Sequence, residues 1–168
     1  MRTTRFTGAP QRPRAATQSR RTSSRTGRRW WRWTASEAVA TGGSVLQWCH
    51  GAPGVVASLA PVAPNDAEHE RLLLAGGELT WRAGPLVKGS NLCHGTAGNG
   101  YAFLALFKRT RDELWLGRAR AFAMHAVAQV ARERAVLQRG RYTLWTGDPG
   151  TALYLADCLA GGGTLPLP

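Results

Sequence analysis

Two cysteines and a histidine have the residue types and the spacing of a zinc site. Cys49 and Cys93 are 44 residues apart, each stands two residues before a Gly-x-x-Gly segment, and His94 follows Cys93 directly. Two thiolates and one imidazole are ligands that zinc prefers, and a set of three leaves one coordination position open for catalysis. A thiol bound at that position would lose its proton and become a nucleophile at neutral pH. Isolated cysteines are also common in apolar cores, so the spacing alone leaves both interpretations open.

The Gly-x-x-Gly segment occurs three times, and each copy opens a run of small or apolar residues. The first two copies are 44 residues apart, and the second and third are 52 apart. A helix that is apolar nearly all round is a buried helix, so each run predicts one. The segments are Gly51–Gly54, Gly95–Gly98 and Gly147–Gly150, and the runs are Val55–Val62, Tyr101–Phe107 and Thr151–Leu159.

Charged stretches separate these runs. Asp66–Arg82, behind a capping residue at Asn65, and Asp112–Leu137 predict amphipathic helices. The alternation of buried and amphipathic helices predicts an all-α fold, a partial α/α toroid of helical hairpins with the buried helices inside. Equivalent positions of neighbouring hairpins then lie side by side, which brings Cys49 next to Cys93.

The positive charge is concentrated at the N-terminus. Residues 1–34 hold ten of the 22 Lys and Arg residues and no acidic residue, whereas residues 35–168 hold 12 basic against 10 acidic residues, a net of +2. We therefore expect a disordered basic tail at 1–34 and one helical domain at 35–168. The tail fits a targeting peptide, an RNA-binding arm that stacks Trp30, Trp31 and Trp33 on bases, or a solvated extension. The near-neutral body argues against nucleic acid as the main partner.

The apolar runs and the cysteine count indicate where in the cell the protein acts. No apolar run is long enough for a membrane span, and no apolar stretch after the N-terminal charges indicates a secretory signal. Three cysteines, an odd number, are typical of a reducing compartment, so we expect a cytoplasmic protein.

Long motifs around the cysteines resemble the lanthionine synthetase C-like (LanC-like) family. Residues 48–54 read WCHGAPG, residues 88–104 read KGSNLCHGTAGNGYAFL, and residues 144–157 contain LWTGDPG and ALYLAD. The resemblance covers about three-quarters of the chain, from Ser44 to Leu165. It implies a toroid of seven helical hairpins and zinc-dependent addition of a thiol, from a peptide cysteine or glutathione, to dehydroalanine or dehydrobutyrine. The family's zinc ligands carry over onto Cys49, Cys93 and His94.

The same resemblance suggests roles for further residues. Lys88 matches a lysine that contacts glutathione, and a lysine can hold a carboxylate of a thiol substrate, although a solvated cation is the simpler interpretation. His50 could donate a proton or orient a ligand, although packing is more common beside a ligand. We expect His69 and His125 on outer helices, without a site role, and Cys158 in the core.

Two departures from the family pattern keep other functions open. Three of the seven inner helices have counterparts here, and the upstream acid/base residues of the peptide cyclases have none. Residues 136–139 read VLQR where glutathione-using members have an Arg-Thr-Pro-Asp segment, so Arg139 or Arg141 would have to substitute. The alternatives are a catalytically inactive fragment or interaction module, nucleic-acid binding through the tail, and completion of the toroid by a partner chain.

Overall fold

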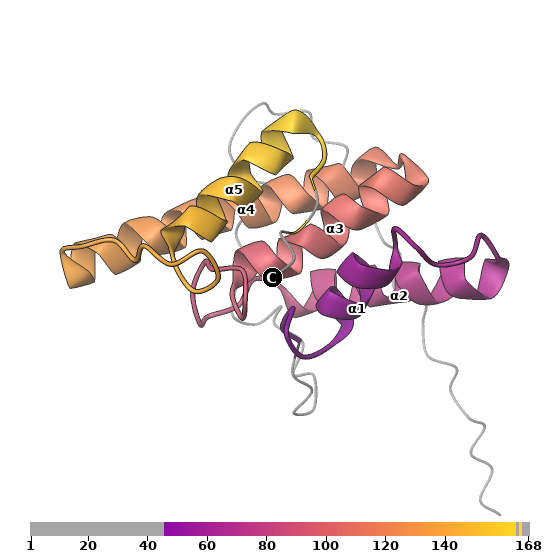
Figure 1. The fold of residues 1–168 in the computed structure, drawn as a ribbon, viewed down its shortest axis with the longest axis horizontal. Coiled ribbons are helices and arrows are strands. Elements are labelled where there is room, and N and C mark those ends of the chain that lie inside the picture. Colours follow the sequence, from indigo (N-terminus) through magenta and orange to yellow (C-terminus); the bar gives the residue numbers. More distant parts are fainter. Residues whose placement is uncertain (1–45, 164, 166–168) are drawn as a thin grey trace, which may run out of the picture.

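The computed structural model describes residues 46–163 and residue 165, and this part of the chain forms five helices (Figure 1). No strand occurs among the described residues, so the predicted all-α class is confirmed. The predicted tail at 1–34 and the first residues of the predicted helical domain lie outside the described part. The helices are α1 (Ala52–Leu59), α2 (Ala67–Ala83), α3 (Thr96–Thr110), α4 (Glu113–Leu137) and α5 (Asp148–Ala160).

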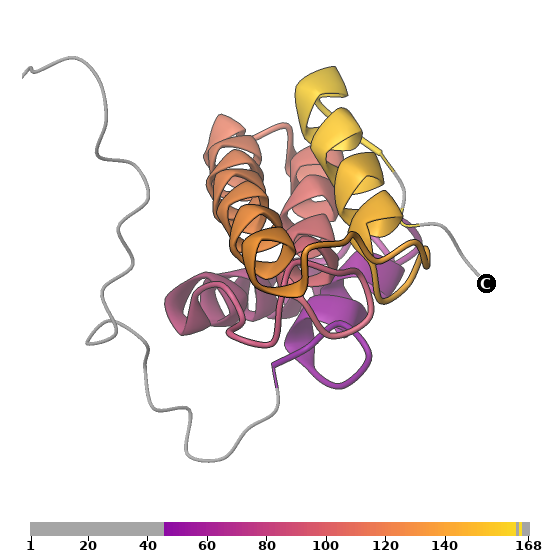
Figure 2. The ribbon, with the colours of Figure 1, turned by 90° about the vertical axis from the view of Figure 1, so that its left-hand side faces the viewer.

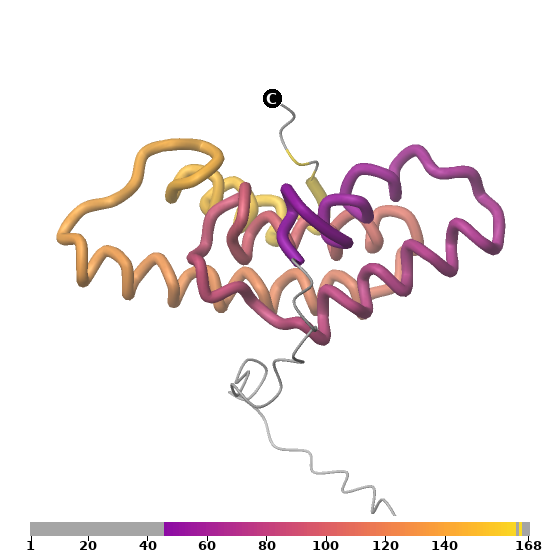
Figure 3. The backbone as a smooth tube through the Cα atoms, turned by 90° about the horizontal axis from the view of Figure 1, so that it is seen from below, coloured from indigo at the N-terminus to yellow at the C-terminus, as the bar shows by residue number. Residues whose placement is uncertain are grey.

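The helices form two layers, which Figures 2 and 3 show from two sides. Helices α1, α3 and α5 make the inner layer, with α3 packed against both of the others, and α2 and α4 make the outer layer. Each outer helix follows its inner partner along the chain, as the apolar and amphipathic runs predict. The arrangement is that of a partial α/α toroid.

The burial of the inner helices differs along the layer. Helix α3 is buried on almost every side, with Ala102, Phe103 and Leu104 fully inaccessible. The prediction of helices buried all round is wrong for α1 and α5 in the described part of the chain, because each has an inner neighbour there on one side only. Val55 of α1 is 55% exposed and Leu159 of α5 is 84% exposed.

The second glycine of each Gly-x-x-Gly segment is required by a close backbone approach. A methyl group at Gly54 would collide with the carbonyl oxygen of Trp48, and one at Gly98 would collide with that of Leu92. A methyl group at Gly150 would collide with the carbonyl oxygen of Leu144 in the same way. In all three repeats the carbonyl belongs to the residue six positions upstream, so each loop folds back onto the helix it precedes.

Loop carbonyls also cap the inner helix α3. The amides of Thr96, Ala97 and Gly98 donate to the carbonyl oxygens of Gly89, Ser90 and Asn91, at 2.9, 3.0 and 3.3 Å. These amides belong to the first helical turn, where no partner exists within the helix. The loop at 89–91 therefore fixes the direction in which α3 leaves the site.

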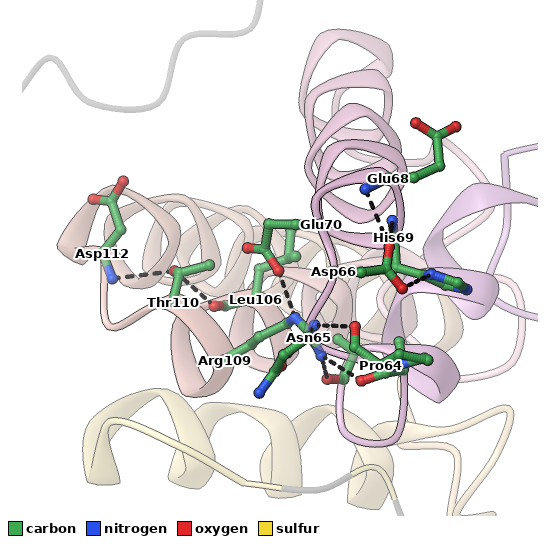
Figure 4. Close-up of polar contacts among 12 residues, drawn as sticks. Pro64, Asn65, Asp66, Glu68, His69, Glu70, Leu106, Arg109, Thr110 and Asp112 are labelled. Atoms are coloured by element: carbon green, nitrogen blue, oxygen red, sulfur yellow. Dashed lines mark hydrogen bonds and ion pairs between the residues drawn. The ribbon is translucent and has the colours of Figure 1, made fainter.

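The outer helix α2 begins one residue later than the predicted cap suggests. Asp66, not Asn65, is the capping residue, and its side chain accepts hydrogen bonds from the amides of Glu68 and His69. Asn65 instead accepts a hydrogen bond from Arg109 at the end of α3 (Figure 4). Both residue types cap helices well, and the contact with Arg109 assigns Asn65 to the loop.

Two half-buried arginines connect helices: Arg109 joins the inner helix α3 to the outer helix α2, and Arg118 joins the two outer helices. Arg109 donates five hydrogen bonds, to the side chains of Glu70 and Asn65 and to three carbonyl oxygens of the loop between α1 and α2 (Figure 4). Arg118 of α4 binds Glu78 of α2 at 2.6 Å, and its guanidinium lies over the rings of Trp81 and Trp115. None of the described helices is long and apolar enough to cross a membrane.

Candidate metal centre

The loops before the three inner helices are joined by hydrogen bonds between equivalent residues. Cys49, Cys93 and Trp145 each stand two residues before the first glycine of a Gly-x-x-Gly segment. The amide of Cys49 donates to the carbonyl oxygen of Cys93 at 3.3 Å, and the amide of Cys93 donates to that of Trp145 at 2.9 Å. This backbone ladder fixes the register of neighbouring repeats and holds the two cysteines side by side.

The two thiols of the ladder lie near each other. Cys49 and Cys93 are both free cysteines at half-buried positions. Burial raises the pKa of the Cys93 thiol, and the nearby thiol of Cys49 raises it further. The thiol of Cys49 also lies 3.8 Å from Oε1 of Gln47. Neutral thiols packed in this way lose their protons when a metal cation binds them.

His94 follows Cys93 directly in the sequence. Its backbone amide donates to Oδ1 of the buried Asn91 at 3.1 Å, and its side chain is half-buried. Within the described residues, no three His, Cys, Asp or Glu side chains come close enough together to hold a metal ion. The donor types fit zinc, and the structure holds the two cysteines side by side, whereas the imidazole of His94 does not form a three-donor cluster with them.

Two tryptophans belong to the loops that carry the ladder. The rings of Trp48 and Trp145 stack with centroids 5.1 Å apart. Trp145 is part of the ladder, and Trp48 precedes Cys49, which is also part of it. Nε1 of Trp48 and Oδ1 of Asn99 are buried without a hydrogen-bond partner among the described residues. Both atoms are able to bind water or a polar group of a ligand. Sequence reasoning missed Trp145, although its place two residues before Gly147 gives it the register of the two cysteines.

A groove opens beside Trp48 and runs between α1 and α3. Its volume is about 790 Å³, and Lys108 is one of its lining residues. The walls are mostly apolar and include Gly163 and Leu165 of the C-terminal segment. The groove is large enough for an extended ligand, and it is lined by Trp48, the residue before Cys49.

The two other predicted site residues are exposed. His50 follows Cys49, and its backbone pairs with Gln47 in a short bridge. Lys88 lies in the loop before α3, next to Gly89, whose φ of 131° requires glycine at the turn. Both side chains are free to move toward a ligand at the thiols.

The remaining histidines and the third cysteine lie away from the thiols. His69 is on α2, where it pairs with Asp66, and His125 is on α4, where burial lowers its pKa. Cys158 is 3% exposed in the core, as predicted. In the loop after α4, Arg141 lies 3.8 Å from Glu133 and Arg139 is exposed, so neither arginine is held at the thiols.

Comparisons with known proteins identify the family. A family model described as lanthionine synthetase C-like protein matches residues 15–165, so the match begins inside the predicted tail. Glutathione S-transferase LANCL1 of Danio rerio is 39% identical over 117 residues, which cover 68% of this chain and 29% of that protein. LanC-like protein GCL1 of Arabidopsis thaliana is 40% identical over 84 residues, which cover 48% of this chain and 19% of that protein. The chain spans less than a third of these curated relatives, and it belongs to the lanthionine synthetase C-like family.

Proposed function

We propose that Cys49, Cys93 and His94 bind one zinc ion. The backbone hydrogen bond between Cys49 and Cys93 carries the proposal, because it holds two cysteines that are 44 positions apart side by side. Their half-buried positions leave one side open to a fourth ligand. His94 supplies the third donor when its side chain rotates toward the thiols, while the hydrogen bond from its amide to Asn91 holds its backbone in place. Two sulfur donors and one nitrogen donor suit zinc better than magnesium or calcium.

The reaction we propose is the addition of a thiol to a dehydroalanine or dehydrobutyrine residue of a peptide. A new bond joins the sulfur to the β carbon, the carbon–carbon double bond becomes single, and a proton is added at the α carbon. Bound zinc would supply the thiolate by lowering the pKa of the attacking thiol. No oxidant or reductant is needed, and the product is a thioether.

The chain's own residues would place the reactants and move the proton. His50 is exposed beside Cys49 and is the proposed donor of the proton to the α carbon. Lys88 is exposed five residues before Cys93 and is the proposed contact for a carboxylate of the thiol substrate. The stacked rings of Trp48 and Trp145 would exclude water from one side of the thiols.

Glutathione or a peptide cysteine is the proposed thiol donor. The similarity to a protein named glutathione S-transferase supports glutathione, whose two carboxylates suit the exposed Lys88. The groove beside Trp48 supports a peptide as the second reactant, because its apolar walls admit an extended chain. We place this chemistry in the cytoplasm, where neighbouring cysteines such as Cys49 and Cys93 stay reduced.

The zinc content of the purified chain tests the metal site. We expect about one zinc per chain by elemental analysis, and none in the Cys49→Ala, Cys93→Ala double variant. Cys158→Ala is the matched control, because it removes a buried thiol of the core and should leave the zinc content unchanged. Zinc bound equally by the wild type and the double variant would refute the assignment.

Mass spectrometry of a dehydroalanine peptide tests the reaction. With zinc and glutathione present, the wild type should raise the mass of the peptide by one glutathione, and the double variant should not. The Lys88→Ala variant should raise the KM for glutathione with little change in kcat, since uniform binding is lost. A zinc-loaded chain that forms no adduct with glutathione or with a cysteine peptide would reduce the function to metal binding.

A further inference from the structure

The groove beside Trp48 follows one face of α3. Tyr101, Ala105 and Lys108 of α3 all line it, and their spacing of four and three residues places them on the same side of the helix. The opposite wall is formed by the end of α1 and the loop after it, with Ala57 among the lining residues. The small alanine side chains leave room between the two helices. The groove therefore runs along α3, and its two ends are chemically different.

The groove contains one cation whose charge is not used within the described part of the chain. Among the described residues its charged lining residues are Lys108 and Arg109, and no acidic residue lines it. Arg109 is 10% exposed, and its guanidinium binds Glu70 and the loop after α1 (Figure 4). Lys108 is exposed and forms no ion pair or hydrogen bond with the described residues. Asp157 accepts the hydroxyl of Tyr101 at 2.6 Å and is not a lining residue, so a carboxylate of a ligand complements the charge of Lys108.

Polar groups on the α1 side of the groove suit a peptide backbone. Ser58 is exposed there, and its hydroxyl has no partner among the described residues. Asn65 accepts a hydrogen bond from Arg109 through Oδ1, which leaves its amide nitrogen able to donate. An extended peptide offers carbonyl and amide groups to such side chains, whereas an aliphatic chain does not. These groups favour a peptide as the occupant of the groove.

Helix α3 sets the distance between the two ends of the groove. A methyl group at Gly98 would lie 3.1 Å from Cβ of Trp48, so Trp48 lies at the level of Gly98. Lys108 stands ten positions later, which corresponds to about 15 Å along the helix axis. An extended peptide covers this distance with about five residues, since each adds about 3.3 Å. Because Trp48 precedes Cys49, a residue held near the thiols and a residue at Lys108 are separated by about the same length of peptide.

We propose that the peptide that receives the thiol carries an acidic side chain about five residues from its dehydroamino acid, and that Lys108 binds this carboxylate. The inference rests on the proposed function, because it concerns the second reactant of that reaction. The dehydroamino acid lies near the thiols, the residues between lie along the groove, and the acidic residue reaches Lys108. The contact is an exposed charge pair, so it determines the preference among peptides and contributes little of the total affinity.

Binding of unreactive peptides to the full chain tests this inference without the reaction. Each fluorescein-labelled peptide carries alanine in place of the dehydroamino acid and one glutamate or glutamine two, five or eight residues from it, on either side. At a separation of five residues, and on one side only, the dissociation constant at low salt should be about three- to fivefold lower for glutamate than for glutamine by fluorescence anisotropy. The other separations should show no difference. Equal affinities for all peptides, or no binding, would overturn the proposal.

Substitution of Lys108 tests which residue binds the acidic side chain. Lys108→Glu should reverse the preference, so that a peptide with lysine at this place binds more tightly than one with glutamate, and Lys108→Gln should abolish it. The position is exposed, so folding should be retained and is checked by circular dichroism. Arg82→Glu, at an exposed position in the last turn of the outer helix α2, makes the same charge change away from the groove and should keep the wild-type preference. A Lys108→Glu chain that still prefers glutamate would refute the assignment.

A second pair of variants tests the groove itself. Ser58→Trp places a large ring in the groove and should weaken the binding of every peptide. Val55→Trp, at an exposed position of α1 that does not line the groove, should bind like the wild type. Binding of dodecanoate, together with no binding of any peptide, would assign the groove to an aliphatic carboxylate and contradict the proposal.

The failure of this inference is distinguishable from the failure of the proposed function. The binding measurements use no thiol and no dehydroamino acid, so a chain that shows the charge preference and forms no thioether would refute the reaction alone. A chain that forms the thioether equally well on glutamate and glutamine peptides, with equal affinity for both, would refute the inference alone.

Discussion

The backbone amide of Cys49 donates a hydrogen bond to the carbonyl oxygen of Cys93, and this bond connects residues 44 positions apart at the start of adjacent inner helices. The bond sets the register of the two repeats and so brings the two thiols near each other. The site therefore depends on the register of the repeats as much as on the cysteines. The glycines that let each loop approach its helix should then matter for metal binding as well as for folding.

Gly98→Ala should destabilise the fold and weaken zinc binding. The added methyl group collides with the carbonyl oxygen of Leu92, so the loop that carries Cys93 must move. We expect the free energy of unfolding in urea to fall by about 3 kcal/mol or more. Gly117→Ala is the control, because its methyl group meets nothing within 4 Å on the exposed side of α4, and it should stabilise the protein by about 0.5–1 kcal/mol. Equal effects of the two substitutions would contradict this explanation of the Gly-x-x-Gly segment.

The order of the helices and the side-by-side position of the two cysteines could be predicted from the sequence. The Gly-x-x-Gly segments mark where the inner helices begin, and their spacing puts Cys49 and Cys93 in one register. Charged residues between the apolar runs mark the outer helices. These features are local in the sequence, so a pattern suffices to find them.

Other features depend on contacts that a pattern does not contain. An apolar run does not show whether a helix has neighbours on both sides, and for that reason the exposure of Val55 and Leu159 was not predictable. The orientation of the His94 side chain depends on its torsion angles, and its distance from the thiols has no sequence signal. The position of Trp145, two residues before Gly147, matches that of the two cysteines. A search for metal ligands does not consider tryptophan, so the residue was missed.

Arg109→Met should loosen the hairpin of α1 and α2. The guanidinium is 10% exposed and donates five hydrogen bonds, so its removal leaves Glu70 and the loop carbonyl oxygens of Ala60 and Ala63 without this donor (Figure 4). We expect the free energy of unfolding to fall by about 2–3 kcal/mol. Arg132→Met, at an exposed position on α4, should change it by less than about 0.5 kcal/mol. Hydrogen exchange of the amides near Asn65 should accelerate in the first variant alone.

The stability of the fold should decrease at alkaline pH because of Cys158. Burial raises the pKa of this thiol from 9.0 to about 11, so the folded state favours the protonated form. Its contribution to stability is complete below pH 9 and is lost as the pH rises from about 9 to about 11, by about 2–3 kcal/mol in total. Cys158→Ala should have a flatter dependence of unfolding free energy on pH over that range. Parallel curves for the wild type and the variant would show that other groups cause the loss.

Asn91→Ala should weaken zinc binding more than it weakens the fold. The side chain of Asn91 is buried, and its Oδ1 accepts a hydrogen bond from the backbone amide of His94 at 3.1 Å, which fixes the backbone of the proposed third ligand. We expect the zinc dissociation constant, measured by competition with a chelating dye, to rise by about 10–100-fold. Asn91→Asp keeps an acceptor oxygen at the same position, so it should restore most of the affinity. If Asn91→Ala binds zinc as tightly as the wild type, His94 is not a ligand, or its backbone position does not limit binding.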